Sequence, residues 1–437
     1  MKGRILVGGT GSGSGKTTVT IALLGALKKR GIKLSAFKCG CDYIDPMFHR
    51  EVLGVESGNI DSFFYTPEIC REIFAESARD FSVIEGVMGF FDGGAGSTEN
   101  VSKILDCGVI LVVNGRGAVQ SILATIHGFL TWKENNISGV ILNNTSENVF
   151  LQISADIEKM GVRALGYLPR LPQDLILESR HLGLVTASEI AGLSEKIDKL
   201  SDIAEKTFDI DGILEMGFEA EEIIPNGLKI SKKESVKIAV SRDEAFCFCY
   251  RENIAVLEKM GAEICYFSPL SDEKLPDCDG LYIVGGYPEL YLDRLEKNAK
   301  LRFDIKNKIE NKLPTIAECG GFMYLSKKID RCEMCGVLDG ECEKKSSLVR
   351  FGYVDMKSEN GGAVLFENGF KGHEFHYYDS TANGGDLVCT KQNGTTWTAG
   401  FLTESLYAGF PHLAFLSSLE SVENFYDKCL KYKKSTK

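Results

Sequence analysis

Residues Arg4–Arg30 read RILVGGTGSGSGKTTVTIALLGALKKR, an apolar run, a glycine-rich turn and a segment with apolar side chains at helical spacing. A strand that passes through a turn into an amphipathic helix is the repeating unit of a parallel sheet covered by helices. Short apolar runs alternate with amphipathic segments throughout the first half of the chain. The strands predicted there are Arg4–Val7, Leu34–Lys38, Val83–Glu85, Val109–Val113, Gly139–Leu142 and Arg163–Tyr167.

A charged segment from Phe218 to Ser235 interrupts this alternation. It contains a Pro-Asn-Gly turn signal and lacks periodicity, so we predict a linker over residues 219–235. The alternation then resumes, and a block rich in β-formers runs from Val349 to Leu416. The predicted fold class is therefore α/β with two domains, an N-terminal parallel sheet over 1–218 and a second α/β domain over 236–437 that ends in antiparallel strands. Helices are expected over 188–211, 250–260, 290–310 and 418–430.

Composition narrows the classes of partner. The 437 residues carry 61 acidic and 50 basic side chains, for a net charge of -11, which argues against nucleic acid or anionic lipid as the partner. No apolar stretch approaches the ~18 residues of a membrane-spanning helix, so a cytoplasmic protein with small-molecule substrates is expected. The 14 cysteines are scattered without zinc-finger spacing, which favours reduced thiols.

The glycine-rich turn has the context of a phosphate-binding loop. Backbone N–H groups can converge there on phosphate oxygens, Lys16 can reach the β- and γ-phosphates, and the Thr17 hydroxyl can face Mg²⁺. The strict phosphate-loop pattern is G-x-x-x-x-G-K-[ST]. This sequence departs from it by one place, because Thr10 stands where the leading glycine is expected and Gly9 comes one residue earlier. The alternative is a plain turn before a helix. The predicted nucleotide-binding residues in the loop are Gly9, Thr10, Gly13, Gly15, Lys16, Thr17 and Thr18.

The Gly9-Thr10 spacing resembles the dethiobiotin synthetase branch of P-loop proteins, whose members activate a carboxylate with ATP. Acidic residues follow later strands of the predicted sheet. Asp45 and Glu85 lie where open parallel sheets bind ligands, so they are candidates for holding Mg²⁺, and Lys38 is a candidate for stabilising charge on a transferred phosphoryl group. The alternative is that these are solvated loop acids.

A second candidate site lies at Cys319, in the segment Pro314–Ile329, PTIAECGGFMYLSKKI. A strand that turns sharply into a helix at a cysteine exposes the sulfur, lets the helix end depress its pKa and points the N–H of Gly320 at a developing oxyanion. Gly286, in a glycine turn after a neighbouring strand, is the candidate for the second donor. The alternative is one more buried cysteine that packs.

A thiol that needs an imidazole base must find it among six histidines. His412 lies late in the domain between β-type segments. His373 and His376 lie in GHEFHYY, where a satisfied core histidine is an equal alternative.

Taken together, these motifs resemble the cobyrinic acid a,c-diamide synthase family over nearly the full length. That family joins a dethiobiotin-synthetase-like ATP domain to a class I glutamine amidotransferase domain of the cobyric-acid-synthase type. The matching stretches are GGTGSGSGKTT, FKCGCDYIDPMFH, VIEGVMGFFDG, GVILN, LGYLPR, RHLGLVTA, IAVSRDEAF, GLYIVGGYPEL, AECGGFMYL and GHEFHYY.

The resemblance implies residue roles. Cys319 is the implied nucleophile and His412 its partner, a dyad without a third member because no Glu follows two residues after the histidine. The other implied site residues are Thr17, Asp45 and Glu85 near Mg²⁺, Lys16 and Lys38 on phosphates, Asp92 near the reacting carboxylate and Asn143 on adenine. The sequence departs from the family pattern at Cys41 (usually Pro), Asn114 (usually Asp) and Ala414 (often His).

The resemblance also implies the reaction: ATP- and glutamine-dependent amidation of the a and c carboxylates of cobyrinic acid through an acyl phosphate, with Mg²⁺. Two alternatives stay open. One is Ni-sirohydrochlorin a,c-diamide synthase of coenzyme F430 assembly, and the other is a P-loop ATPase switch with an inactive amidotransferase domain. The oligomeric state is also open, with a homodimer as one candidate.

Overall fold

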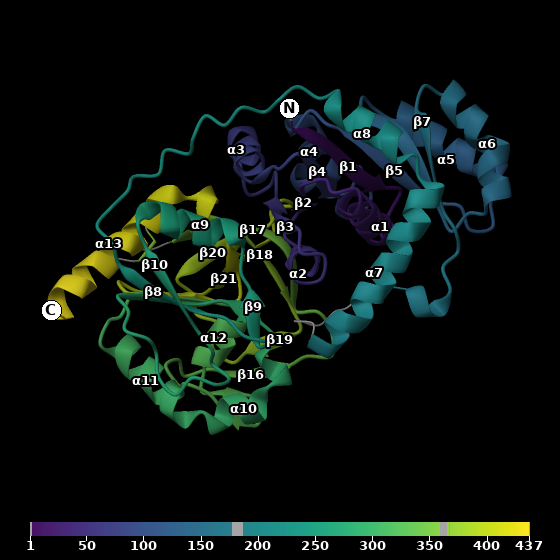
Figure 1. Cartoon of the computed structure of the whole chain (residues 1–437). Coiled ribbons are helices and arrows are strands. Elements are labelled where there is room, and N and C mark those ends of the chain that lie inside the picture. The colour runs from purple at the N-terminus through teal and green to yellow at the C-terminus, as the bar shows by residue number, and fades with distance from the viewer. Residues whose placement is uncertain (1, 177–186, 359–364, 367, 437) are drawn as a thin grey trace. The chain divides into compact units, whose positions relative to one another are not determined.

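The computed structural model describes residues 2–176, 187–358, 365–366 and 368–436. The chain divides into two compact units, Met1–Arg180 with Val185–Leu228 and His181–Leu184 with Lys229–Lys437 (Figure 1). Nearly all of the RHLGLVTA stretch at 180–187 lies outside the described residues. Within the described part of the chain, no helix is both long and apolar enough to cross a membrane.

The N-terminal unit is built on a seven-stranded sheet in the order β3-β2-β4-β1-β5-β6-β7. Every pair in it is parallel, as predicted. The strands are β1 Gly3–Gly9, β2 Leu34–Cys39, β3 Glu56–Ile60, β4 Phe81–Glu85, β5 Gly108–Asn114, β6 Ile137–Asn143 and β7 Arg163–Leu168. Sequence analysis missed β3, because ESGNI has a single aliphatic residue and therefore no apolar run.

The helices of this unit are α1 Lys16–Lys29, α2 Ile44–Glu51, α3 Pro67–Ser77, α4 Thr98–Ile104, α5 Gln120–Thr131, α6 Glu147–Lys159, α7 Ala187–Thr207 and α8 Ile210–Phe218. Helices α1, α7 and α8 share one apolar core with the sheet, into which alternate residues of β1 such as Ile5 and Val7 pack. The helix predicted over 188–211 ends early. Asp209 caps α8 by accepting from the N–H of Gly212 at 2.9 Å, which starts a new helix.

The second unit contains a six-stranded sheet in the order β10-β8-β11-β13-β23-β22. Only the β22–β23 pair in it is antiparallel. A separate antiparallel sheet has the order β21-β20-β17-β18-β24, so the predicted change from parallel to antiparallel strands is confirmed. The strands of these two sheets are β8 Lys237–Ser241, β10 Glu263–Phe267, β11 Gly280–Ile283, β13 Thr315–Glu318, β17 Arg350–Ser358, β18 Phe370–His376, β20 Leu387–Thr390, β21 Thr396–Ala399, β22 Phe401–Leu402, β23 Leu406–Gly409 and β24 His412–Leu413.

Smaller elements complete this unit. They are β9 Phe246–Phe248, β12 Gly285–Gly286, β14 Lys328–Ile329, β15 Cys332–Glu333, β16 Glu341–Lys344, β19 Tyr378–Ser380, α9 Arg251–Met260, α10 Leu292–Lys297, α11 Ala299–Glu310, α12 Gly320–Leu325 and α13 Leu419–Thr436. The single helix predicted over 290–310 is wrong. Asn298 separates α10 from α11, and its Nδ2 donates to the carbonyls of Pro269 at 2.9 Å and Asp272 at 2.8 Å, which holds the break in place.

Candidate active sites: a phosphate loop and a thiol elbow

The phosphate loop joins β1 to α1 in a conformation that requires glycine. Gly13 has φ 76° and Gly15 has φ 101°, values that favour glycine over other residues. A Cβ at Gly15 would lie 2.0 Å from Nδ2 of Asn143, and one at Gly9 would lie 2.2 Å from Oγ of Ser14. The loop therefore has no room for a side chain at Gly9 or Gly15, and it leaves the first N–H groups of α1 for an anion.

The polar side chains of the loop lie where phosphate chemistry needs them. Lys16 is buried at the start of α1, and its Nζ donates to the carbonyls of Gly11 at 3.2 Å and Met88. Burial, and then the charge of Lys38, lower the pKa of Lys16. Thr10 donates its N–H to the carbonyl of Val112 at 3.2 Å. Thr18 is half-buried in the first turn of α1.

A cluster of charges lies at the carboxyl ends of β2 and β4. Nζ of Lys38 lies 2.9 Å from Oε1 of Glu85 and forms a second ion pair with Asp45, while Oγ1 of Thr17 donates to the same Glu85 oxygen at 2.6 Å. Burial, and then the charge of Asp45, raise the pKa of Glu85 to about 7. Burial alone would raise the pKa of Asp45. The positive charge of Lys38 outweighs the effect of burial, so the pKa of Asp45 is lowered.

This cluster fits Mg²⁺. Oε2 of Glu85 is buried and has no hydrogen-bond donor among the described residues, so one carboxylate oxygen remains for a cation. The described residues contain no group of three or more His, Cys, Asp or Glu side chains able to hold a metal. Two carboxylates and a hydroxyl suit Mg²⁺ nevertheless, because this ion keeps several waters and uses one or two carboxylates together with substrate phosphates.

Asp92 and Asn143 flank the loop. Oδ2 of Asp92 accepts from the N–H of Gly89 at 3.2 Å, and the side chain is exposed beside the loop, as a residue near a substrate carboxylate would be. Asn143 is buried, and its Nδ2 donates to the carbonyl of Ser14 at 2.9 Å. In this structure Asn143 supports the phosphate loop, and its contact with adenine stays a prediction.

The thiol elbow is the second candidate site. Cys319 lies between β13 and α12 with φ 48° and ψ -104°, a backbone conformation that only an over-determined site holds in a residue other than glycine. Its N–H donates to the carbonyl of Gly409 at 2.8 Å, and its carbonyl accepts from Met323 at 2.9 Å. The predicted strand-to-helix turn at this cysteine is therefore present.

Two glycines bring the backbone close beside the thiol. A Cβ at Gly320 would lie 3.1 Å from the backbone nitrogen of Gly286, so the two predicted oxyanion donors are adjacent. A Cβ at Gly321 would lie 2.3 Å from the carbonyl oxygen of Ile283. Side chains at these positions would push α12 away from the turn at Gly285–Gly286.

His412 adjoins the same turn. A Cβ at Gly285 would lie 2.2 Å from Cε1 of His412, which places the imidazole against the glycines that flank the thiol. His373 pairs with His412 across β18 and β24, and its ring stacks on that of His412 at 4.8 Å. Nδ1 of His373 bonds to the Tyr250 hydroxyl at 3.1 Å, and His376 stacks on Phe410 at 3.9 Å. His373 and His376 are thus buried residues that pack in the core of the unit, and His412 is the base candidate.

Glu318 is the residue that sequence analysis missed. It directly precedes Cys319, is 1% exposed, and its Oε2 lies 3.5 Å from Nδ1 of His412. Its Oε1 accepts from the N–H of Leu413 at 3.1 Å and from the Tyr282 hydroxyl at 3.2 Å. A carboxylate therefore lies beside the histidine, where the resemblance implied a dyad without one. The adjacent Glu-Cys pair in AECGG was the only signal for it in the sequence.

The N–H of Gly320 at the helix end lowers the pKa of the Cys319 thiol, as expected, but burial outweighs this effect. Burial, and then the charge of Glu289, raise the pKa of the Cys319 thiol, and Glu374 and Glu318 raise it further. Desolvation disfavours a thiolate in a cysteine that is 7% exposed, and α12 spans only Gly320–Leu325. The raised pKa therefore favours the protonated form of the thiol in the free protein.

Comparisons with known proteins match both halves of the chain. A CobQ/CobB/MinD/ParA nucleotide binding domain matches residues 5–185, and a CobB/CobQ-like glutamine amidotransferase domain matches residues 237–419. Cobyrinate a,c-diamide synthase of Caldanaerobacter subterraneus subsp. tengcongensis is 37% identical, over 97% of this chain and 98% of its own. The proteins of that name from Priestia megaterium and Picrophilus torridus are each 39% identical to this chain. The match covers 99% of this chain and 98% of the Priestia megaterium protein, and 97% of this chain and 98% of the Picrophilus torridus protein.

Proposed function

The chain belongs to the cobyrinate a,c-diamide synthase family, and we propose that it amidates the a and c carboxylates of cobyrinic acid with ATP and glutamine. It is an ATP-dependent ligase with glutamine as the amido donor. The observation that carries the proposal is the presence in one chain of a phosphate loop and of a cysteine elbow with an adjoining histidine and carboxylate.

The N-terminal unit activates the substrate. A carboxylate oxygen of the macrocycle attacks the γ-phosphorus of ATP, ADP leaves, and a mixed carboxylic-phosphoric anhydride forms. Lys16 and Lys38 stabilise the negative charge of the transferred group. Asp92, exposed beside the loop, would lie near the reacting carboxylate. Thr17, Asp45 and Glu85 would hold Mg²⁺, which neutralises charge on the phosphates when bound.

The second unit releases ammonia. His412 takes the proton of the Cys319 thiol, and the thiolate attacks the amide carbon of glutamine. The N–H groups of Gly320 and Gly286 stabilise the oxyanion, and the proton returns from His412 to the leaving ammonia. Water then hydrolyses the thioester to glutamate. Glu318 faces Nδ1 of His412, which keeps Nε2 for the proton transfer and stabilises the imidazolium.

Ammonia released by the glutaminase reaction is consumed in the amidation reaction. Ammonia attacks the acyl carbon of the anhydride, phosphate leaves, and an amide forms in place of each carboxylate. An acyl phosphate that met water instead of ammonia would be lost to hydrolysis, so a glutaminase in the same chain as the ATP site has a chemical purpose.

Mass spectrometry of the products tests this proposal. The purified chain is given ATP, Mg²⁺ and glutamine with an equimolar mixture of cobyrinic acid and Ni-sirohydrochlorin. Two successive amide mass changes on cobyrinic acid support the proposal. Amidation of Ni-sirohydrochlorin alone would assign the coenzyme F430 reaction instead, and ATP hydrolysis without glutaminase activity would indicate an ATPase switch.

A further inference from the structure

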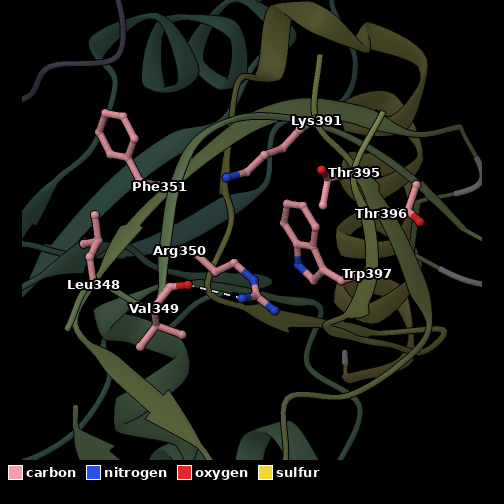
Figure 2. Close-up of a pocket in the computed structure, with 8 residues that line it drawn as sticks. All are labelled: Leu348, Val349, Arg350, Phe351, Lys391, Thr395, Thr396 and Trp397. Carbon is pink, nitrogen blue, oxygen red and sulfur yellow. Dashed lines mark hydrogen bonds between the residues drawn. The ribbon is translucent and has the colours of Figure 1, made fainter. Parts of the chain in front are cut away.

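Two groups of charged side chains in this protein differ in their access to water. In the second unit, a cavity of about 330 Å³ holds the cations Arg350 and Lys391 beside Trp397 (Figure 2). Arg350 is exposed and Lys391 is half-buried, so water can solvate both cations. In the N-terminal unit, by contrast, Lys38 and Glu85 are buried. A polar atom without a partner in that buried cluster costs free energy, so its presence requires a reason.

His49 on α2 contributes such an atom. Its imidazole is buried, and Nε2 lies 3.7 Å from Oε2 of Glu85. Neither of these two atoms has a hydrogen-bond partner among the described residues. Oε2 is also the Glu85 oxygen that remains for a cation. The histidine therefore adjoins the proposed Mg²⁺ site at a distance slightly longer than a hydrogen bond.

The other ring nitrogen of His49 indicates where the ring hydrogen lies. Nδ1 is 3.1 Å from the hydroxyl of Ser57, a buried residue of β3, and this is the one hydrogen bond of that hydroxyl among the described residues. When Ser57 donates to Nδ1, the ring hydrogen is on Nε2 and faces Glu85. The opposite tautomer would set a lone pair of Nε2 against a carboxylate oxygen in a buried site, which is unfavourable. The contacts therefore favour Nε2 as a donor.

We propose that His49 is a positioning residue for Mg²⁺ binding, whose Nε2–H orients the Glu85 carboxylate, an inference that rests on the proposed function. Oε1 of Glu85 is already held by Thr17 at 2.6 Å and by Lys38 at 2.9 Å. A donor at Oε2 fixes the rotation of the carboxylate about these contacts. A carboxylate oxygen has two lone pairs, so Oε2 can accept from His49 and still face the cation.

A ligand role for His49 is less favourable than a donor role. Mg²⁺ is a hard cation that prefers oxygen ligands, and imidazole suits softer metals. A ligating Nε2 would also need the tautomer that the Ser57 contact disfavours. Residues that orient a metal ligand typically change metal affinity by about 10- to 100-fold when they are replaced, so a donor at this position has a measurable effect.

Calorimetric titration of the full chain with ADP, once with Mg²⁺ and once with EDTA, tests the inference. The ratio of the two Kd values reports how much the cation contributes to nucleotide binding. His49→Asn keeps a polar group near Ser57 but is too short to reach Glu85, so Kd with Mg²⁺ should rise about tenfold while Kd with EDTA stays unchanged. His49→Gln places its amide nitrogen close to the position of Nε2 and should restore most of the Mg²⁺ effect. The control is His127→Asn, at an exposed histidine of α5.

The outcomes separate this inference from the proposed function. A wild type whose Kd for ADP does not depend on Mg²⁺ overturns the proposed cation site, and the inference with it. A Mg²⁺-dependent wild type with unchanged Kd in His49→Asn overturns the inference alone. Equal losses in His49→Asn and His49→Gln, or an equal change with EDTA, would indicate a packing role and also overturn it.

Two further measurements keep the test decisive. Thermal melting identifies a variant that fails to fold, and if His49→Asn does, Ser57→Ala takes its place. That variant leaves the imidazole but removes the donor to Nδ1, so Kd with Mg²⁺ should rise about threefold or more, and an unchanged value overturns the inference. Pulsed electron paramagnetic resonance with Mn²⁺ in place of Mg²⁺ should show no directly bound nitrogen from His49. Nitrogen coupling that disappears in His49→Gln would make His49 a ligand and overturn the positioning role.

Discussion

Oε2 of Glu318 lies 3.5 Å from Nδ1 of His412, and Glu318 is the residue directly before the candidate nucleophile Cys319. The contact depends on two strand pairings, β13 with β23 and β24 with β18. The N–H of Leu413 donates to the other oxygen of the same carboxylate at 3.1 Å, which fixes the acid relative to the histidine's own strand. Glu318, the last residue of β13, and Cys319, which follows it, thus supply both the acid and the thiol of the site.

Glu318→Gln tests this relationship. The amide keeps an oxygen for Leu413 and Tyr282 but removes the charge facing His412, so glutaminase kcat should fall on the order of 10²- to 10⁴-fold with little change in KM for glutamine. Steady-state glutaminase kinetics measure the effect. Ammonia-dependent amidation should stay normal, and Glu333→Gln, an exposed glutamate of the same unit, is the control. A normal kcat would show that Glu318 does not assist His412.

Cys319→Ser separates the two active sites. A serine hydroxyl is a much poorer nucleophile of similar volume, so the variant should lose glutamine-dependent amidation yet form the same diamide when ammonium salt is supplied at mildly alkaline pH. Product mass and ADP release measure both activities. His412→Ala should behave in the same way if it is the base. Full glutamine-dependent activity in Cys319→Ser would refute the nucleophile assignment.

Lys16→Ala tests the phosphate loop. Loss of the side-chain cation at the β- and γ-phosphates should lower amidation by at least about 10²-fold, while hydrolysis of glutamine at Cys319 continues at least in part. Coupled ADP release and glutamate formation, followed in parallel, measure the two reactions. Lys29→Ala is the control, since this lysine is exposed at the other end of α1 and pairs with Asp202 at 2.7 Å. Normal amide formation by Lys16→Ala would exclude the loop as the nucleotide site.

Asp45→Asn and Glu85→Gln test the proposed cation site. Each keeps the shape of the side chain and removes one negative charge, so ATP-dependent turnover should fall about 10²-fold, most strongly at limiting Mg²⁺. A magnesium titration of the rate measures the shift. Circular dichroism should show an unchanged fold, and Glu158→Gln on α6 provides a control on the surface. Normal rates at low Mg²⁺ in both variants would reduce these residues to structural ion-pair partners of Lys38.

The reactivity of Cys319 should depend steeply on pH. Burial raises the pKa of this thiol, so the thiolate fraction is small at neutral pH and grows as the pH rises above the ordinary range for cysteine. Alkylation by iodoacetamide, followed by peptide mass spectrometry, should therefore be slow at pH 7 and accelerate with alkalinity. The Cys319→Ser variant in the same assay supplies the background. Rapid alkylation at neutral pH would mean that the thiol is already ionised in the free protein.

Features that depend on neighbouring residues in the chain were predictable. The phosphate loop, the strand-to-helix turn at Cys319 and the parallel sheet all follow from apolar runs, glycines and spacing within short segments, because backbone conformation there is set by adjacent residues. Strand β3 was missed for the same reason. ESGNI has no local strand signal, and it becomes a strand by pairing with β2 at the sheet edge.

Only the tertiary structure determined which distant residues meet. Asn143 donates to Ser14 across 129 positions, and Lys38 pairs with both Asp45 and Glu85, so residues predicted singly as ligands form one charge network. The order of strands in each sheet also brought Glu318 to His412 and buried Cys319 so that its pKa rises instead of falling. The physical reason is that electrostatics and desolvation act through space, while sequence patterns record only what neighbours along the chain impose.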